Sequence, residues 1–324
     1  LYSVDAVGNV LSMTDPLNRV TRFEYDSKSR MIYQTNPLGE TIEYTYNALG
    51  LPASVTTAEG NRFEVRYDSF GNILALIDPL DHRVTQVIGL NGLPGTRLFA
   101  DGAAMTMRYD EFGQMISQVN QVGVQANFTY NDAGEKTSHS QNRAINGEQV
   151  TETTAYDYDA IDRVIAITDA LGNRSTMTYD EVGNMVTKTD ALGRTTEYTF
   201  DVYRRLTRTD FADGSFTSAS YDPEGNQIST TDQLGRTTDF VFDDLNRLIE
   251  SRYANGSVEF NEYNAVSELV ATTDANGNRT TYVYDDASRL IRETNALGHS
   301  TQYEYDQDGR QIAMIDGLNR RTEY

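Results

Sequence analysis

The sequence predicts an all-β protein in which repeated antiparallel hairpins form one long, curled sheet. This prediction depends on three observations: a sequence motif that recurs every 21 residues, a turn residue at a fixed position in each motif, and short segments rich in Thr, Tyr, Val and Ile between the turns. The motif is TDALGRTTEYTFD at 189–201, TDQLGRTTDFVFD at 231–243 and TDANGNRTTYVYD at 273–285. Such a fixed period is typical of arrays in which each unit packs only on its neighbours.

The last aromatic residue of each motif is followed by Asp or Asn, and the spacing of these aromatics gives the length of the repeat. Successive aromatics of this kind are 21 residues apart over most of the chain. We call them the ladder aromatics and predict a structural role for Tyr25, Tyr46, Tyr67, Tyr179, Phe200, Tyr221, Phe242, Tyr284 and Tyr305. Their spacing divides residues 1–324 into about fifteen units of a single array. Because the pattern is still in phase at residue 324, we expect the chain to be a fragment of a longer protein.

Two stretches depart from the period. Between Tyr130 and Tyr158 the spacing is 28 residues, so seven residues are added near 138–150. A lengthened hairpin there is expected either to project toward a partner or to be a tolerated loop. At 88–100 the unit keeps its spacing but has Ile88 in place of the aromatic.

A first turn is predicted seven residues before each ladder aromatic. Gly, Asn or Asp occupies this position, and these residues tolerate the positive φ that hairpin turns require. In the unit with the insertion, Asn146-Gly147 supplies a turn further upstream instead. The turn glycines for which we predict a structural role are Gly39, Gly172, Gly193, Gly235, Gly277 and Gly298.

A second turn is predicted directly after each ladder aromatic, where Asp begins segments such as DEVGN at 180–184. An aspartate at the start of a turn can accept hydrogen bonds from the backbone two residues on, as in an Asx turn. Between the two turns remain six or seven residues, enough for a strand but too few for a helix. Alternation then places Tyr198 and Phe200 on one face of their strand and Glu197 and Thr199 on the other. The sequence leaves open which face lines an interior.

Simple geometry limits the architecture. About thirty strands at roughly 4.8 Å spacing make a ribbon on the order of 140 Å long. Open twisted sheets seldom exceed about ten strands without curling or splitting. The ribbon is therefore predicted to curl into a spiral, a shell wall or a solenoid.

Composition excludes several classes of function. The 48 acidic residues outnumber the 27 basic ones, giving a formal net charge of −21, so nucleic acid and anionic membrane are poor partners. No cysteine is present, which excludes disulfides and thiolate metal sites. No apolar run is long enough, at about 18 residues, to insert this segment in a membrane.

No catalytic, metal or cofactor site is predicted. The pairs Asp243-Asp244 and Asp285-Asp286 fall at repeat turns, where a carboxylate has a structural role in capping the backbone. The aspartate turns lack the second and third carboxylates of a calcium loop. The three histidines, at 82, 139 and 299, are scattered and are interpreted as surface residues. We therefore expect that the chain is not an enzyme and uses no cofactor.

The recurring Y-D-x-x-G-N/R, T-D-A-L-G-R/N and T-x-Y-x-Y-D resemble the YD repeat of the Rhs family, over essentially the whole chain. This repeat is shared with TcC-type toxin components, bacterial wall-associated proteins and animal teneurins. For the bacterial toxins, the resemblance implies a β ribbon that spirals into a hollow shell around a C-terminal toxin domain. In those proteins aspartates of a core region cleave the toxin free, but this chain has no DPxGL-type core motif, so no cleavage residue is transferred to it.

The resemblance implies a structural role in an encapsulating shell that sequesters a C-terminal toxin domain of the same parent protein until delivery. The expected partners are that enclosed domain and a secretion or delivery apparatus, and the expected localisation is that of a secreted effector made in the cytoplasm. The alternative is an extracellular adhesin or carbohydrate-binding surface module, because aromatic stripes can also stack on sugars.

Overall fold

The computed structural model describes residues 1–89, 92–145 and 148–324. The turn predicted at Asn146-Gly147 and part of the irregular unit at 88–100 lie outside these ranges. The described residues form strands and turns, and within them no helix is long and apolar enough to cross a membrane.

The described residues form 31 strands in one sheet. They are β1 (Tyr2–Val4), β2 (Val10–Thr14), β3 (Val20–Tyr25), β4 (Met31–Thr35), β5 (Thr41–Tyr46), β6 (Pro52–Thr56), β7 (Arg62–Tyr67), β8 (Ile73–Ile77), β9 (Arg83–Ile88), β10 (Pro94–Leu98), β11 (Ala104–Tyr109), β12 (Met115–Val119), β13 (Gln125–Tyr130), β14 (Lys136–Ile145), β15 (Glu148–Tyr158), β16 (Val164–Thr168), β17 (Arg174–Tyr179), β18 (Met185–Thr189), β19 (Thr195–Phe200), β20 (Leu206–Asp210), β21 (Phe216–Tyr221), β22 (Gln227–Thr231), β23 (Thr237–Phe242), β24 (Leu248–Arg252), β25 (Val258–Tyr263), β26 (Leu269–Thr273), β27 (Arg279–Tyr284), β28 (Leu290–Thr294), β29 (Ser300–Tyr305), β30 (Gln311–Ile315) and β31 (Arg321–Glu323).

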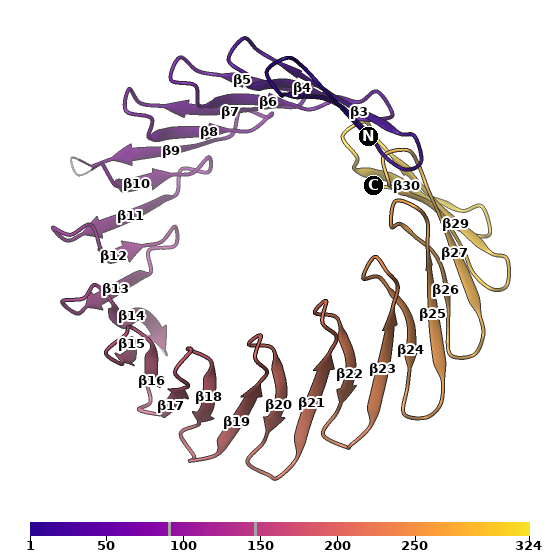
Figure 1. The fold of residues 1–324 in the computed structure, drawn as a ribbon. Helices are drawn as coiled ribbons and strands as arrows, with labels where there is room; N and C mark the ends of the chain where they lie inside the picture. Colours follow the sequence, from indigo (N-terminus) through magenta and orange to yellow (C-terminus); the bar gives the residue numbers. More distant parts are fainter. Residues whose placement is uncertain (90–91, 146–147) are drawn as a thin grey trace.

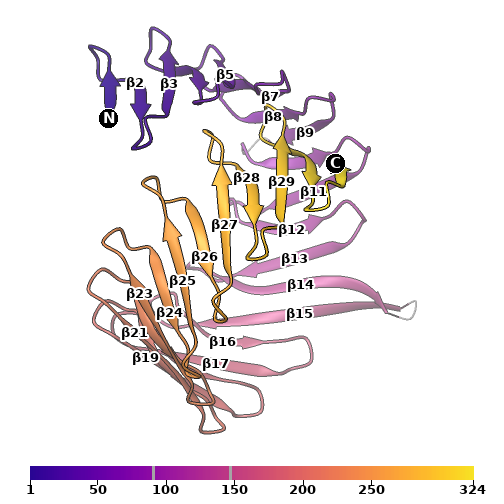
Figure 2. The same cartoon turned by 90° about the vertical axis from the view of Figure 1, so that its right-hand side faces the viewer.

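Each strand pairs antiparallel with its neighbours in sequence, from the β1–β2 pair to the β30–β31 pair. The ribbon curls around an open lumen, so that both termini lie on the same side of the ring (Figure 1). Turned by 90°, the same ribbon shows the first and last strands offset along the ring axis (Figure 2). The predicted fold class, an all-β array of hairpins in one curled sheet, is confirmed.

The two edges of the ribbon differ in how the strands pair. We call the edge with the predicted glycine turns rim A and the edge with the aspartate turns rim B. Across a rim B turn, β23 and β24 pair from Phe242↔Leu248 to Asp239↔Arg252. Across the following rim A turn, β24 and β25 pair over only three positions, those nearest rim A. Successive hairpins therefore separate toward rim B.

The lengthened hairpin consists of β14 and β15, which have 10 and 11 residues. Their register runs from Ser138↔Ala155 to Ile145↔Glu148. These two strands reach beyond their neighbours at rim A (Figure 2). The seven added residues thus extend a hairpin without disturbing the order of the sheet.

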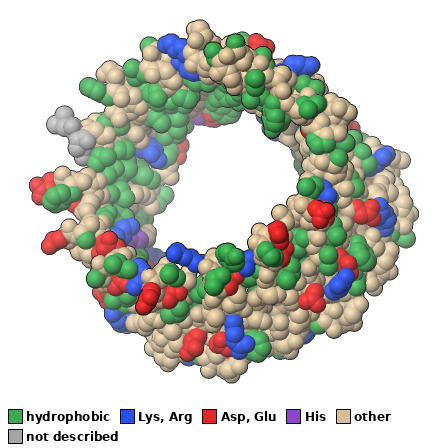
Figure 3. Space-filling model, in the orientation of Figure 1, with side chains coloured by type: hydrophobic (Ala, Val, Ile, Leu, Met, Phe, Trp, Pro, Cys, Tyr) green, Lys and Arg blue, Asp and Glu red, His purple; other side chains and the backbone are tan. Residues whose placement is uncertain are grey.

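The face of the sheet that lines the lumen is the ladder face. Hydrophobic side chains gather on the lumen wall over the part of the ring that holds β7 to β12 (Figure 3). On β7, Phe63 and Val65 alternate with Arg62, Glu64 and Arg66. The apolar side of this strand is therefore the lumen side. Because side chains alternate with a period of two, the ladder residue at the end of β7 shares that side.

The sheet is a single layer, and its most deeply buried apolar residues are alanines. Ala166, Ala271 and Ala313 are at most 1% exposed, while no large side chain among the described residues is fully buried. A single layer cannot form a central core, so cohesion must come from contacts between neighbouring strands and hairpins.

Candidate functional site, a repeated wall joint

Most rim B turns are organised around the carboxylate of their first residue, an aspartate. In the turn 243–247, Oδ1 of Asp243 accepts hydrogen bonds from the backbone N–H of Leu245 at 2.9 Å and of Arg247 at 3.0 Å. Its Oδ2 accepts Nε of Arg247 at 2.8 Å. One side chain thus satisfies two backbone donors and fixes an arginine, as expected for an Asx turn.

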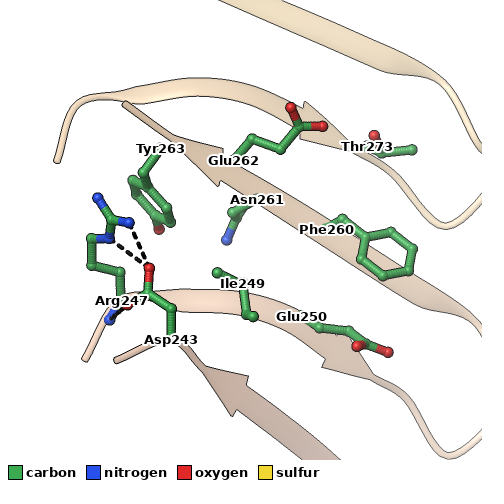
Figure 4. A pocket seen from close by; sticks show the side chains of 9 residues that line it. All are labelled: Asp243, Arg247, Ile249, Glu250, Phe260, Asn261, Glu262, Tyr263 and Thr273. Carbon is green, nitrogen blue, oxygen red and sulfur yellow. Dashed lines mark hydrogen bonds and ion pairs between the residues drawn. The ribbon is translucent and has the colours of Figure 1, made fainter. Parts of the chain in front are cut away.

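The arginine held in this way reaches the next hairpin. The Arg247 guanidinium lies 4.9 Å from the centre of the Tyr263 ring, and its Nη1 donates to the carbonyl oxygen of Asn264 at 2.9 Å. The Tyr263 hydroxyl in turn donates to the carbonyl oxygen of Leu248 at 3.1 Å. Figure 4 shows the aspartate, arginine and tyrosine meeting between the two hairpins.

We call this arrangement the wall joint: a turn Asp or Asn, the residue four positions later, and the ladder aromatic of the next hairpin. It occupies the place where strand pairing between hairpins is missing, so side chains replace backbone hydrogen bonds there. Arg30 with Tyr46, Arg163 with Tyr179, Arg205 with Tyr221 and Arg289 with Tyr305 repeat the cation–π contact at 4.5–5.3 Å.

Six of the seven ladder tyrosines donate their hydroxyl to a backbone carbonyl 15 residues earlier. This bond measures 2.8 Å for Tyr46 and Tyr67, 2.7 Å for Tyr179, 3.0 Å for Tyr221, 2.9 Å for Tyr284 and 2.8 Å for Tyr305. Tyr25, Phe200 and Phe242 end their strands opposite Met31, Leu206 and Leu248. A phenylalanine at a ladder position fills the joint but has no hydroxyl to donate.

This difference predicts that Phe200→Tyr stabilises its joint. The new hydroxyl would lie within reach of the carbonyl of Met185, 15 residues earlier, in the geometry of the neighbouring tyrosines. A net gain of about 0.5–1.5 kcal/mol is expected for one added hydrogen bond. Chemical denaturation checks the gain, and a loss of stability would show that the joint at Phe200 cannot accept the hydroxyl.

The predicted rim A glycines all adopt the left-handed conformation. Their φ angles are +86° for Gly39, +83° for Gly172, +76° for Gly193 and Gly235, and +81° for Gly277 and Gly298. A Cβ added at any of these six glycines would meet nothing within 4 Å. A substitution there would therefore be opposed by the backbone conformation and not by crowding.

Sequence reasoning missed that rim B needs the same conformation. The fourth residue of the rim B turns also has positive φ, at Gly50, Gly183, Arg204, Asn246 and Ser288 among others. The sequence signal was a small or polar residue four positions after each aromatic, but its variability, including an arginine, hid the shared backbone geometry.

The turn hydrogen bonds lower the pKa values of many turn aspartates. For Asp26, the side-chain hydrogen bond from Arg30 is the largest cause and lowers the pKa to about 2. The side-chain hydrogen bond from Asn173 acts in the same direction on the pKa of Asp169, as does that from Arg236 on the pKa of Asp232.

These pKa directions predict acid sensitivity. A carboxylate whose pKa is lower in the folded state stabilises the fold above its unfolded pKa, near 3.8, and loses that contribution as the pH falls through its folded pKa. Stability should therefore fall between about pH 4 and pH 2. Denaturation midpoints across this range test it, and Asp26→Asn should make the loss shallower, because Asn47 begins the next rim B turn without a titrating group. A flat profile would contradict the assignment.

Within the described ranges, no group of three or more His, Asp or Glu residues is arranged to hold a metal ion, and two of the three histidines contact a neighbouring side chain. His82 bonds to Asp78 Oδ2 at 2.8 Å in an exposed rim A turn. His139 is not the surface residue that the sequence indicated, since it is half-buried on β14 and stacks on Phe128 at 5.1 Å. The two rings meet because Phe128 and His139 are opposite each other in the register of β13 and β14, as Phe240 and Ser251 are in β23 and β24.

One winding sheet with a joint at most repeats defines a YD-repeat shell wall. The family profile described as RHS Repeat matches residues 158–193, 179–215, 221–258, 263–299 and 284–321, and the profile described as Teneurin YD-shell matches residues 1–86. The chain belongs to the Rhs/YD-repeat family. No curated protein sequence matches it.

Solved structures share the fold at low sequence identity. The crystal structure of TcdB2-TccC3-TEV is 13% identical with a TM-score of 0.60, and covers 98% of this chain. The Photorhabdus luminescens Tc holotoxin pore with the TccC3 D651A mutation and TcdB2-TccC3 without its hypervariable C-terminal region are each 14% identical with TM-scores of 0.58, covering 99% of this chain. In each case the chain spans 22% of the other chain's length.

Proposed function

We propose that this array is a non-catalytic segment of an encapsulating wall that sequesters a C-terminal toxin domain of the same parent protein until delivery. The single observation that carries the proposal is the continuous sheet curled around a lumen, with an apolar lumen wall over β7 to β12. A continuous antiparallel wall, with wall joints where the strand pairing between hairpins ends, keeps protease and substrate from whatever lies inside.

Two findings support this reading. Structures with the same fold contain Tc toxin components, and one of these is TcdB2-TccC3 without a hypervariable C-terminal region. The acidic chain also suits a cargo that is basic, because opposite charge favours association. By analogy with these toxins, the parent protein is proposed to be a secreted effector that meets a delivery apparatus.

The wall joints favour this function over the carbohydrate-binding alternative. A tyrosine that stacks on sugar needs an uncovered ring face. The Tyr179 hydroxyl is already bonded to Val164, and its ring is covered by Arg163. The ladder is therefore engaged in holding hairpins together.

Expression of the complete parent protein in the cytoplasm tests containment. A variant that opens the wall, such as Gly193→Val, should make a tolerated protein toxic to its host, whereas the matched Gly193→Asn should stay tolerated. Equal tolerance of both variants, together with glycan binding by the array, would replace containment with the adhesin function.

A further inference from the structure

The spiral contacts itself along a seam. The first three rim A turns, at 15–19, 36–40 and 57–61, lie against three rim B turns one spiral turn later, at 264–268, 285–289 and 306–310 (Figure 2). The apolar turn residues show the contact, because Leu17 is 44% exposed and Leu192, at the same place in a rim A turn off the seam, is 78% exposed. The seam is thus a packed interface between segments about 250 residues apart.

Three ion pairs cross the seam, one of them between Arg310 Nη2 and Glu59 Oε2 at 2.7 Å. The other two run in opposite senses. Arg19 Nη1 lies 2.9 Å from Glu268 Oε1, and each side chain is 11% exposed. One unit further along, Arg289 Nη1 on rim B lies 3.2 Å from Glu40 Oε1 on rim A. The positive partner is on rim A in the Arg19 pair and on rim B in the Arg289 pair.

The third crossing supplies a missing turn cap. The turn 57–61 begins with Thr57, where most turns begin with Asp or Asn. Asp308 from rim B accepts the backbone N–H of Glu59 and the Thr57 hydroxyl, both at 2.8 Å, and also the Asn61 side-chain amide.

In the ordinary turn 169–173, the aspartate of the turn itself accepts the equivalent backbone and amide donors. A carboxylate from one spiral turn away therefore does at Thr57 what the local aspartate does elsewhere. The conformation of the turn 57–61 therefore depends on the position of the turn 306–310.

A shift by one 21-residue unit in either direction breaks this pattern. Arg19 would then face Arg247 or Arg289 in place of Glu268. With the shift toward the N-terminus, Glu40 would face Glu268, and the turn at Thr57 would face Ala287, which has no carboxylate. Like charges placed opposite each other are destabilising, so only one alignment satisfies all three crossings.

We propose that these three crossings encode the register of the spiral: rim A of the first three units is a docking surface that accepts only the rim B turns at 264–268, 285–289 and 306–310. The pattern fixes how many units complete one spiral turn, and with it the width of the lumen. Strand pairing alone cannot set this number, because every hairpin pairs with its neighbours in the same way.

Crosslinking tests the register. Ala58 and Ala287 line one small cavity of about 220 Å³ at the seam, and the chain has no cysteine of its own. The variant Ala58→Cys/Ala287→Cys should therefore form an intramolecular crosslink with a short bismaleimide. Adding Arg19→Glu and Arg289→Glu, which puts like charges at two of the three ion pairs, should lower the yield at least about fivefold. The four-residue exchange that also contains Glu40→Arg and Glu268→Arg should restore it.

The matched control is Arg194→Glu/Arg247→Glu on the same cysteine background. These arginines hold the same positions in their turns and bond to the same kind of aspartate, but they lie off the seam. Their yield should stay within about twofold of the parent. An equal loss in this control, or no recovery in the four-residue exchange, would overturn the proposal.

Thr57 gives an independent test of the third crossing. Thr57→Asp restores the usual aspartate of the turn but sets a second carboxylate against Asp308, so it should lower crosslinking. Thr57→Asn caps the turn without charge and should leave crosslinking unchanged. If Thr57→Asp crosslinks as well as the parent, Asp308 does not contribute to the register.

Discussion

Gly193→Val is expected to destabilise its part of the wall by about 1–3 kcal/mol, because a β-branched side chain resists the left-handed conformation. Gly193 has a φ of +76°, and its N–H closes the turn on the carbonyl oxygen of Asp190 at 2.9 Å. The turn must distort to relieve the strain. Chemical denaturation measures the loss of stability, and limited proteolysis should place the new cleavage near residues 190–194.

Gly193→Asn is the control, because the protein itself places asparagine at this position. Asn18 and Asn319 occupy the same place in their rim A turns with φ of 63° and 60°. Asparagine should therefore cost only a few tenths of a kcal/mol, within the range of a tolerated left-handed residue. Equal stability of the valine and asparagine variants would contradict the structural role predicted for the turn glycines.

Tyr179→Ala is expected to open one wall joint, at a cost of about 2–3 kcal/mol. This is below the 3–5 kcal/mol typical of a fully buried aromatic, since the lumen face is only partly covered. The substitution removes the ring under Arg163 and the hydroxyl bonded to Val164 at 2.7 Å. In an array, the damage should stay local, so hydrogen exchange should rise in β16 and β17 and stay unchanged far from them.

Tyr179→Phe separates the two contributions. It keeps the ring and loses only the hydrogen bond, so a loss of about 0.5–1.5 kcal/mol is expected. Phe200 and Phe242 occupy equivalent positions, which shows that the ring alone is compatible with the fold. A phenylalanine variant as unstable as the alanine variant would mean that the hydroxyl, and not the packed ring, holds the hairpins together.

The fold could be predicted from the sequence because the same pattern of turn and strand residues recurs in nearly every 21-residue unit. Local rules for turns and alternation, applied to one 21-residue unit, gave hairpins, and the number of units required a curled ribbon. The orientation of the ladder face became clear only in the structure, from the charged residues that alternate with Phe63 and Val65 on β7. That assignment depends on the sense of curvature, which no single strand specifies.

The joints and the seam were beyond sequence reasoning for a physical reason. The Arg247–Tyr263 contact depends on how far successive hairpins separate, and Arg19–Glu268 depends on how many units complete a spiral turn. Both are properties of accumulated twist and curvature. In the sequence, an arginine four residues after a turn aspartate predicts only a local ion pair. In the structure, the same arginine also contacts the neighbouring hairpin.

The most direct test of containment is limited proteolysis with mass spectrometry on the complete parent protein, following peptides C-terminal to residue 324. The proposal predicts that these peptides survive protease while the wall is native and are cut once mild denaturant or Gly193→Val loosens it. Free cleavage of the same peptides while the hairpins resist protease would show that nothing is enclosed, and would contradict containment.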